Sequence, residues 1–151
     1  MRAELNVEAV VKANAQFWEQ MLAMNLERVE IPDQFCVSPG HVVASVELAG
    51  VWTGLIEVRM ADGLARTATS AMLMQPLEEV SGPDVLDATK EIANMIAGVI
   101  KSSLPPPCTM TVPSSVVEAR GFCSPHRTED SLVVAFWHES GELMVRIWES
   151  G

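Results

Sequence analysis

The sequence is poor in positive charge. Its 151 residues include ten Lys and Arg against twenty Asp and Glu, which gives a formal net charge of −10 at pH 7. Binding to nucleic acid or to an anionic membrane surface depends on clustered basic side chains. The composition therefore argues against both kinds of partner, although a locally complementary patch could still bind a protein.

The sequence also lacks a long hydrophobic run. The longest nearly apolar stretch, Ile92–Ile100, is interrupted by Asn94 and is far shorter than the ~20 residues that a membrane-spanning helix needs. Residues 1–14 contain no apolar signal core and no small-residue cleavage pattern. We therefore expect a cytoplasmic protein with no membrane segment.

Cysteine is scarce, and its spacing is irregular. The three residues, Cys36, Cys108 and Cys123, lie far apart in the sequence, and no Cys-x-x-Cys pair is present. An odd number of cysteines without an export signal is typical of free thiols in a reducing compartment. The sequence therefore predicts three free thiols and no disulfide framework.

Several catalytic and metal-binding motifs are also missing. His41, His126 and His138 are scattered and have neither HxxxH nor HExxH spacing, so no metal site is expected. No serine lies in a Gly-x-Ser-x-Gly context, and no Gly-rich phosphate loop is present. These absences argue against a zinc enzyme and a serine hydrolase.

The hydrophobic periodicity predicts a mixture of helices and strands. Helices are expected over Val7–Leu26, over Asp62–Leu73 with Asp62 as its cap, and over Asp84–Ser103. Strands are expected over 35–48, Leu55–Met60, Cys108–Val112, Ser115–Arg120, Leu132–His138 and Glu142–Trp148, with loops over 75–83 and 122–130. Strands grouped at both ends with helices between them indicate an α+β fold, an antiparallel sheet covered on one face by long helices. We expect residues 1–151 to form a single domain.

The segment Asp87–Gly98 is the most informative part of the chain. At about 100° per residue, Asp87, Glu91, Asn94 and Gly98 fall within roughly a 60° arc of one helix. The opposite side is mostly apolar and carries Leu86, Thr89, Ile92, Ile96, Val99, Ile100 and Ser103. The helix can therefore bury its apolar side and present an acid and an amide, one turn apart, to another molecule. Gly98 lies on the same side and leaves a spot without a side chain, where a partner could approach closely.

This helix resembles the signature helix of the CheC/CheX/FliY chemotaxis phosphatases. The string Glu91-Ile-Ala-Asn94-Met-Ile-Ala-Gly98 is similar to the CheX branch in particular. The preceding stretch, Gly50-x-x-x-Gly54 followed by a strand, resembles the family's sequence before its signature helix. The later segment Thr111-Val112-Pro113-Ser114 resembles the proline-bearing segment after it.

The resemblance implies a CheC/CheX-like fold and a specific activity. Members of this family dephosphorylate CheY, a response-regulator receiver domain that carries an aspartyl phosphate. By resemblance, Glu91 would pair with the receiver's conserved lysine, and Asn94 would orient the attacking water. Asp87, Lys90 and Gly98 would contact the partner. The chain would need no cofactor of its own, because the Mg²⁺ belongs to the receiver.

The sequence also departs from the family pattern at some positions. The N-terminal helix has no second Glu-x-x-Asn motif, so one site per chain is expected, as in CheX. Val99 follows Gly98 where relatives often have asparagine, and helical periodicity predicts that Val99 points to the buried side. Val112 precedes Pro113 where threonine or serine would be expected.

Three functions remain open from the sequence. The first is a CheX-like phosphatase, and the second is a non-catalytic module of the same fold that docks a receiver or another signalling protein. The third is a structural dimer whose polar arc faces water. We also expect a homodimer, because Trp137 and Trp148 lie on a C-terminal strand pair whose edge a second copy would cover.

Overall fold

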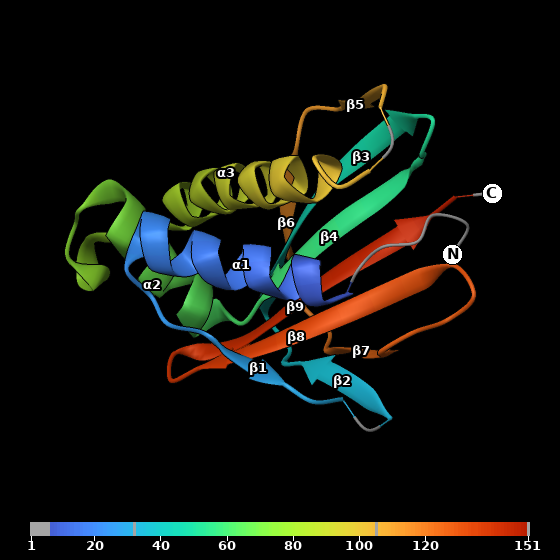
Figure 1. The fold of residues 1–151 in the computed structure, drawn as a ribbon. Coiled ribbons are helices and arrows are strands. Elements are labelled where there is room, and N and C mark those ends of the chain that lie inside the picture. The colour runs from blue at the N-terminus through green and yellow to red at the C-terminus, as the bar shows by residue number, and fades with distance from the viewer. Residues whose placement is uncertain (1–6, 32, 105, 151) are drawn as a thin grey trace.

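The computed structural model describes residues 7–31, 33–104 and 106–150. Within these ranges three α-helices lie on one face of a mainly antiparallel sheet, as Figure 1 shows. The helices are α1 (Val7–Leu22), α2 (Asp62–Leu73) and α3 (Gly82–Lys101), with the short 3₁₀ helix η1 (Leu77–Glu79) between α2 and α3. No helix among the described residues is long and apolar enough to cross a membrane.

The main sheet is antiparallel at every recorded strand pair. Its strands, in spatial order, are β1 (Glu27–Val29), β8 (Ser131–His138), β9 (Gly141–Glu149), β4 (Gly54–Met60), β3 (His41–Gly50) and β5 (Cys108–Met110). Strand β6 (Ser114–Glu118) pairs with β3 as well. The α+β class predicted from the sequence is therefore confirmed.

A second, two-stranded sheet lies on the other side of the main sheet. Its strands are β2 (Gln34–Val37) and β7 (Phe122–Pro125), which pair antiparallel. In Figure 1 they lie beneath β8 and β9, away from the helices. The three helices cover one face of the main sheet, as predicted, and this small layer covers part of the other face. Residues 122–130 were predicted to form a loop, and this prediction was wrong for Phe122–Pro125, which form β7.

The alternation of side chains along the central strands divides them between two apolar clusters. Leu132, Val134 and Phe136 of β8 point into the main core under the helices. Val133 of β8 and Met144 of β9 point the other way and pack with β2 and β7. Strand β8 is therefore buried on both faces, which explains its nearly continuous apolar sequence.

Helix α1 ends earlier than its periodicity predicts. The helix stops at Leu22 because Ala23 adopts a left-handed conformation, with φ of 52°. The Ala23 N–H donates to the Glu19 carbonyl, and the Met24 N–H donates to the Trp18 carbonyl. These bonds satisfy carbonyls at the end of the helix. The residues that follow are free to form the short edge strand β1.

The start of α2 also differs from the prediction. Ala61 is the N-cap residue and makes no side-chain capping bond, so the prediction that Asp62 caps this helix was wrong. Asp62 lies one position later, in the first turn, and forms an ion pair with Arg66 over 3.2 Å. An acidic side chain in the first turn still favours the helix dipole.

The prediction of three free thiols was wrong for two of them. Cys36 and Cys123 form a disulfide, and Cys108 is a buried free thiol. The two bonded cysteines are 87 residues apart in sequence, but β2 and β7 place them directly opposite each other, with their Cα atoms 4.0 Å apart. This pairing depends on tertiary structure, so the spacing in the sequence could not reveal it.

The C-terminal strand pair does not have the uncovered edge on which the dimer prediction was based. Strand β9 lies between β8 and β4, and β1 pairs with β8 over Ala135–Trp137. Trp137 and Trp148 remain exposed, at 50% and 38%. They stand opposite Glu142 and Ser131 respectively, at the two ends of the β8–β9 pair, and so do not form one patch.

Candidate functional site

Helix α3 has a well-defined beginning. Ser81 is its N-cap, and the Ser81 hydroxyl oxygen accepts a hydrogen bond from the Asp84 backbone N–H over 3.2 Å. The Asp84 carboxylate in turn accepts from the Ser81 N–H over 3.3 Å. This reciprocal arrangement is a capping box, and Pro83 in the first turn fits the start of a helix. The acidic Asp84 also lies where the helix dipole favours negative charge.

Packing fixes the rotation of α3 about its axis. The buried side chains form one stripe along the helix: Val85, Ala88, Thr89, Ile92, Ala93, Ile96, Ala97 and Ile100. The Thr89 hydroxyl donates to the Val85 carbonyl over 2.8 Å, so this buried polar group is satisfied. From β6, the Ser115 hydroxyl donates to the Leu86 carbonyl over 2.7 Å. Because the apolar stripe and this bond hold the helix, its outer face has a defined direction.

The four residues of the predicted polar arc lie on that outer side. Asp87 and Glu91 are exposed, and Asn94 and Gly98 are half-buried. Among the described residues, the Glu91 carboxylate and the Asn94 amide make no side-chain hydrogen bond or ion pair with each other or with another side chain. Both groups are therefore available to a partner. Figure 1 shows α3 running across the helical side of the sheet, beside α1.

Asp87 and Lys90 form a weak pair next to this site. The Lys90 Nζ atom lies 4.0 Å from an Asp87 carboxylate oxygen. The Lys90 side chain is 41% exposed and the Asp87 side chain is 82% exposed. Exposed ion pairs at this spacing stabilise a helix only slightly. Both side chains can therefore reorient towards a bound protein at little cost.

Gly98 leaves open space on the same face. A Cβ atom added at Gly98 would meet no atom within 4 Å. The chain's own packing therefore does not require glycine here, although glycine lowers helix stability by about 1 kcal/mol relative to alanine.

The prediction that Val99 is buried was wrong, because its side chain is 39% exposed. Ala88, three turns earlier on nearly the same side of α3, is buried. The last turn of the helix therefore extends beyond the packing that covers the earlier turns. As a result, Val99 adds an apolar side chain to the surface next to Gly98.

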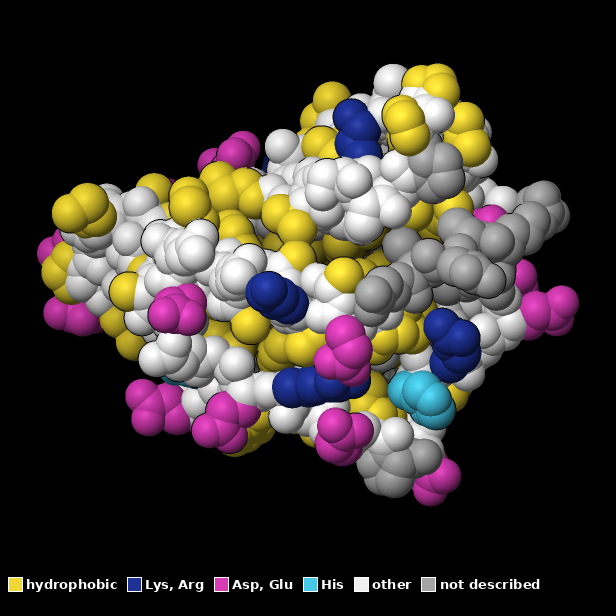
Figure 2. Space-filling model, in the orientation of Figure 1, with side chains coloured by type: hydrophobic (Ala, Val, Ile, Leu, Met, Phe, Trp, Pro, Cys, Tyr) yellow, Lys and Arg dark blue, Asp and Glu magenta, His cyan; other side chains and the backbone are white. Residues whose placement is uncertain are grey.

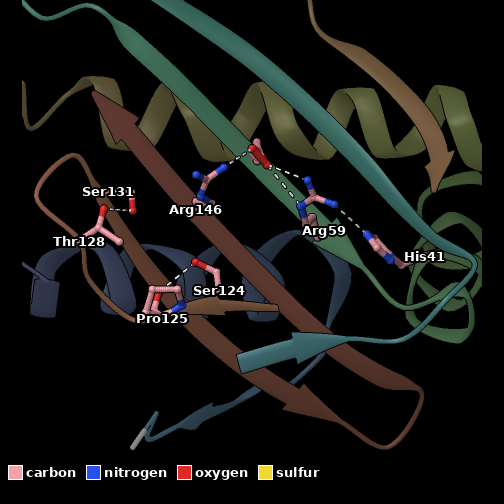
Figure 3. A network of polar contacts seen from close by, with 8 residues as sticks. His41, Arg59, Ser124, Pro125, Thr128, Ser131 and Arg146 are labelled. Carbon is pink, nitrogen blue, oxygen red and sulfur yellow. Dashed lines mark hydrogen bonds and ion pairs between the residues drawn. The ribbon is translucent and has the colours of Figure 1, made fainter. Parts of the chain in front are cut away.

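A buried charged network, which was not predicted from the sequence, lies on the opposite face of the sheet. Glu57 on β4 is 6% exposed and accepts hydrogen bonds from Arg59 and, over 2.8 Å, from Arg146. Figure 3 shows that Arg59 also approaches His41, with the Arg59 Nη1 and His41 Nε2 atoms 3.0 Å apart. The alternation of side chains along β3, β4 and β9 could have predicted that these charged residues share one face of the sheet. It could not have predicted that a second layer buries that face. The main sheet separates this network from Asn94.

Glu142 is a second anchored carboxylate on β9. It accepts hydrogen bonds from the Ser38 N–H over 2.7 Å and from the Ser38 hydroxyl over 2.6 Å. Burial raises the pKa of Glu142, but hydrogen bonds from the Ser38 hydroxyl, the Ser38 N–H and the Glu142 backbone, together with the electrostatic effect of the nearby His41, outweigh burial and hold the pKa below its ordinary value. The ionised carboxylate therefore ties the β2–β3 connection to β9.

The described surface shows no sign of a metal centre. Within residues 7–31, 33–104 and 106–150, no group of three or more His, Cys, Asp or Glu side chains is arranged to hold a metal ion. Figure 2 shows that the basic side chains on the viewed face lie among acidic and apolar ones. The described part of this face therefore offers no continuous basic surface.

Comparison of the sequence with protein families identifies a match that spans more than half of the chain. The family model described as "Chemotaxis phosphatase CheX" matches residues 42–136, which include all of α3. No curated protein matches the chain in sequence.

Solved structures with the same fold cover nearly the whole chain. Chemotaxis protein CheX from Vibrio vulnificus has a TM-score of 0.78 at 20% identity, covering 99% of both chains. CheX in a CheX–CheY–BeF3–Mg²⁺ complex from Borrelia burgdorferi has a TM-score of 0.74 at 19% identity, covering 96% of this chain and 97% of that one. FliY from Thermotoga maritima has a TM-score of 0.64 at 15% identity, covering 98% of this chain and 93% of that one. At these identities the likeness establishes the fold.

Proposed function

The chain belongs to the chemotaxis phosphatase CheX family, and from that premise we propose that it accelerates hydrolysis of the aspartyl phosphate on a CheY-like receiver domain. The observation that carries the proposal is the outer face of α3. An exposed carboxylate at Glu91 and a half-buried amide at Asn94 stand one turn apart, with no other described side chain bonded to either. The proposal includes a cytoplasmic location, as the sequence predicts.

The proposed reaction requires few catalytic groups from this chain. An aspartyl phosphate is already an activated acyl phosphate, so the main requirement is to align one water molecule in line with the leaving oxygen. A carboxamide suits this task because it donates and accepts hydrogen bonds and stays neutral. We assign this role to Asn94, which would enter the receiver's phosphorylated site.

Glu91 would fix the approach of the two proteins. A carboxylate forms charge-assisted hydrogen bonds with an ammonium group, so Glu91 is suited to pair with a lysine of the receiver. The spacing of three residues lets Glu91 and Asn94 reach the same site from one helix face. The Mg²⁺ would be held by the receiver.

The surface around these two residues would contact the receiver. Asp87 and Lys90 can reorient to meet charges on the partner, since their mutual ion pair is weak. Gly98 leaves room for a close approach of the partner's backbone. The structure from Borrelia burgdorferi is of a CheX with a CheY, and that pairing supports a CheY-like partner for this chain.

The test is to add the chain to a phosphorylated CheY-like receiver with Mg²⁺ and to measure inorganic phosphate release. We expect the wild-type chain to accelerate release. Asn94→Ala removes the group that aligns the water, and we expect it to lower the acceleration about a hundredfold. Glu91→Gln should weaken binding to the receiver, because it removes the charge that pairs with lysine.

The matched controls change the same kinds of group outside α3. Asn25→Ala removes an exposed amide after α1, and Glu19→Gln neutralises an exposed carboxylate on α1. Both should retain wild-type acceleration. No acceleration by the wild-type chain would contradict the proposal, and full activity of Asn94→Ala would contradict the assignment of that residue.

A binding titration separates catalysis from docking. We expect the receiver carrying beryllofluoride, a phosphoryl mimic, to bind both the wild-type chain and Asn94→Ala. If the wild-type chain bound the receiver but did not accelerate phosphate release, the chain would be the non-catalytic docking module of the second hypothesis. If it bound no receiver, the structural hypothesis would be favoured.

We also propose that the chain forms a homodimer. The proposal rests on the exposed side chains of Trp137 and Trp148, which lie at opposite ends of the β8–β9 pair, so that a second copy would cover one of the two. Multi-angle light scattering across a dilution series should give a molar mass near twice the 16.4 kDa of one chain. A mass of one chain at every concentration would contradict the dimer.

A further inference from the structure

One cysteine pair is accessible from solution. Cys36 and Cys123 form a disulfide between directly opposed positions of β2 and β7, and both residues are exposed. Cys108 is buried instead, and its Sγ atom lies 3.4 Å from the Trp52 carbonyl oxygen. A reductant in solution can therefore reach the disulfide, while the third cysteine is protected.

The disulfide lies on the outside of a layer whose inner side chains pack on the main sheet. Successive side chains of a strand point to opposite sides, so the neighbours of the cysteines point inwards. Val37 is buried against Val133 and Met144. The ring centroid of Phe122 lies 3.8 Å from the guanidinium carbon of Arg59, which belongs to the network in Figure 3. The disulfide thus joins the two strands that cover this network.

Apart from the disulfide, the layer is held by the packing of Val37 and Phe122 on the main sheet and by the hydrogen bonds from Ser38 to Glu142. Strands β2 and β7 have four residues each, and a two-stranded sheet of this size is marginally stable by itself. The main core beneath the helices is a separate cluster that contains neither bonded cysteine. Loss of the bond should therefore loosen the layer and leave the core intact.

We infer that the Cys36–Cys123 disulfide is a redox-modification site that takes a dithiol reductant, and that its oxidation state sets how firmly β2 and β7 are held against the sheet. A thiolate of the dithiol attacks one sulfur, the S–S bond breaks, and the other cysteine leaves as a thiolate. The second thiol of the reductant then displaces the first cysteine. Two electrons pass to the chain, which gains two thiols after protonation, and the reductant becomes a disulfide. This inference does not depend on the proposed phosphatase activity.

The first test counts reactive thiols in the folded chain. The purified protein, treated with iodoacetamide without denaturant, should gain no alkyl group before reduction and two after dithiothreitol, by intact mass. Two groups before reduction would show that the bond does not form. None after reduction would show that it is not accessible, and three would show that Cys108 is not protected, so each of these results overturns the inference.

The second test measures the layer itself. Hydrogen exchange of the amides in β2 and β7 should be at least tenfold faster in the reduced chain than in the oxidised chain, while α3 exchanges equally in both. In the double variant Cys36→Ser, Cys123→Ser, the amides of β2 and β7 should exchange as fast as in the reduced chain, and dithiothreitol should not change their exchange rate. The matched control Cys108→Ala should respond to dithiothreitol like the wild type. Equal exchange of β2 and β7 in the two wild-type forms would overturn the role of the bond in holding the layer.

Discussion

At the scale of single residues, Gly98 is unfavourable for the stability of α3 but suits the proposed contact with a partner. The position is open, since an added Cβ meets nothing within 4 Å. Glycine inside a helix is therefore not required by the fold, and it lowers stability. A role in letting the receiver approach would account for glycine at this position.

We predict that Gly98→Ala raises the free energy of unfolding by up to about 1 kcal/mol. The same methyl group should lower receiver dephosphorylation, because it occupies space that the partner uses. Urea denaturation and phosphate release measure the two effects separately. Gly82→Ala is the matched control, because it also faces open space but lies about 24 Å along the helix from Gly98. A Gly98→Ala variant with full activity would remove this residue from the proposed contact surface.

At the scale of elements, the packing of α3 holds Glu91 and Asn94 in a fixed direction. Its apolar stripe is held against the sheet and the other helices, and the Ser115 hydroxyl bonds to the Leu86 carbonyl. Its first turn is closed by the capping box of Ser81 and Asp84. A frayed first turn would release Asp87 before it released Asn94, which lies two turns further along.

We predict that Ser81→Ala lowers the free energy of unfolding by about 1 kcal/mol, because it leaves the Asp84 backbone N–H without its side-chain acceptor. Hydrogen exchange of the amides over 84–86 should become faster, while those around Asn94 should change little. Ser81→Thr keeps a capping hydroxyl and should behave like the wild type. Unchanged exchange in the first turn of Ser81→Ala would show that the capping box does not stabilise α3.

At the scale of the whole molecule, the layers on the two faces of the sheet have different chemistry. The helical side carries the polar arc of α3, and the other side carries Glu57 with its arginines beneath β2 and β7. The second side is held by long-range ties: the Cys36–Cys123 bond and the hydrogen bonds of Glu142 to Ser38. Its stability should therefore respond to redox state and to pH.

The pH response follows from Glu142. Its pKa is lower in the folded chain than its ordinary value, because Ser38 and His41 favour the ionised form over the opposing effect of burial. Its contribution to stability is therefore fully present above the ordinary carboxyl pKa of 4.5 and is lost as pH falls through the folded value. We predict that Glu142→Gln reduces the loss of stability that the wild type shows on acidification below that pH.

Urea denaturation at a series of pH values between neutral and acidic measures this dependence. Glu139→Gln removes the same charge from an exposed position of the β8–β9 hairpin and should retain the wild-type pH dependence. Identical pH dependence of Glu142→Gln and the wild type would show that ionisation of Glu142 does not stabilise the fold.

The sequence by itself determined the features that depend on neighbouring residues. The 3.6-residue period identified α3 and its polar arc, because residues three and four apart share a helix face. The alternating and β-branched segments identified most strands of the main sheet. The antiparallel α+β class followed from the order of these elements, and the string around Glu91 and Asn94 identified the family. Whether Glu91 and Asn94 act on a receiver stays a prediction.

The tertiary structure alone decided the features that join distant residues. The Cys36–Cys123 bond exists because two short strands place those positions opposite each other. The Glu57–Arg146 ion pair depends on the register of β4 with β9, which no local pattern contains. The exposure of Val99 depends on where the packing around α3 ends. Local periodicity sets the direction of a side chain relative to its own helix or strand, and only the packing of the whole chain decides what that side chain meets.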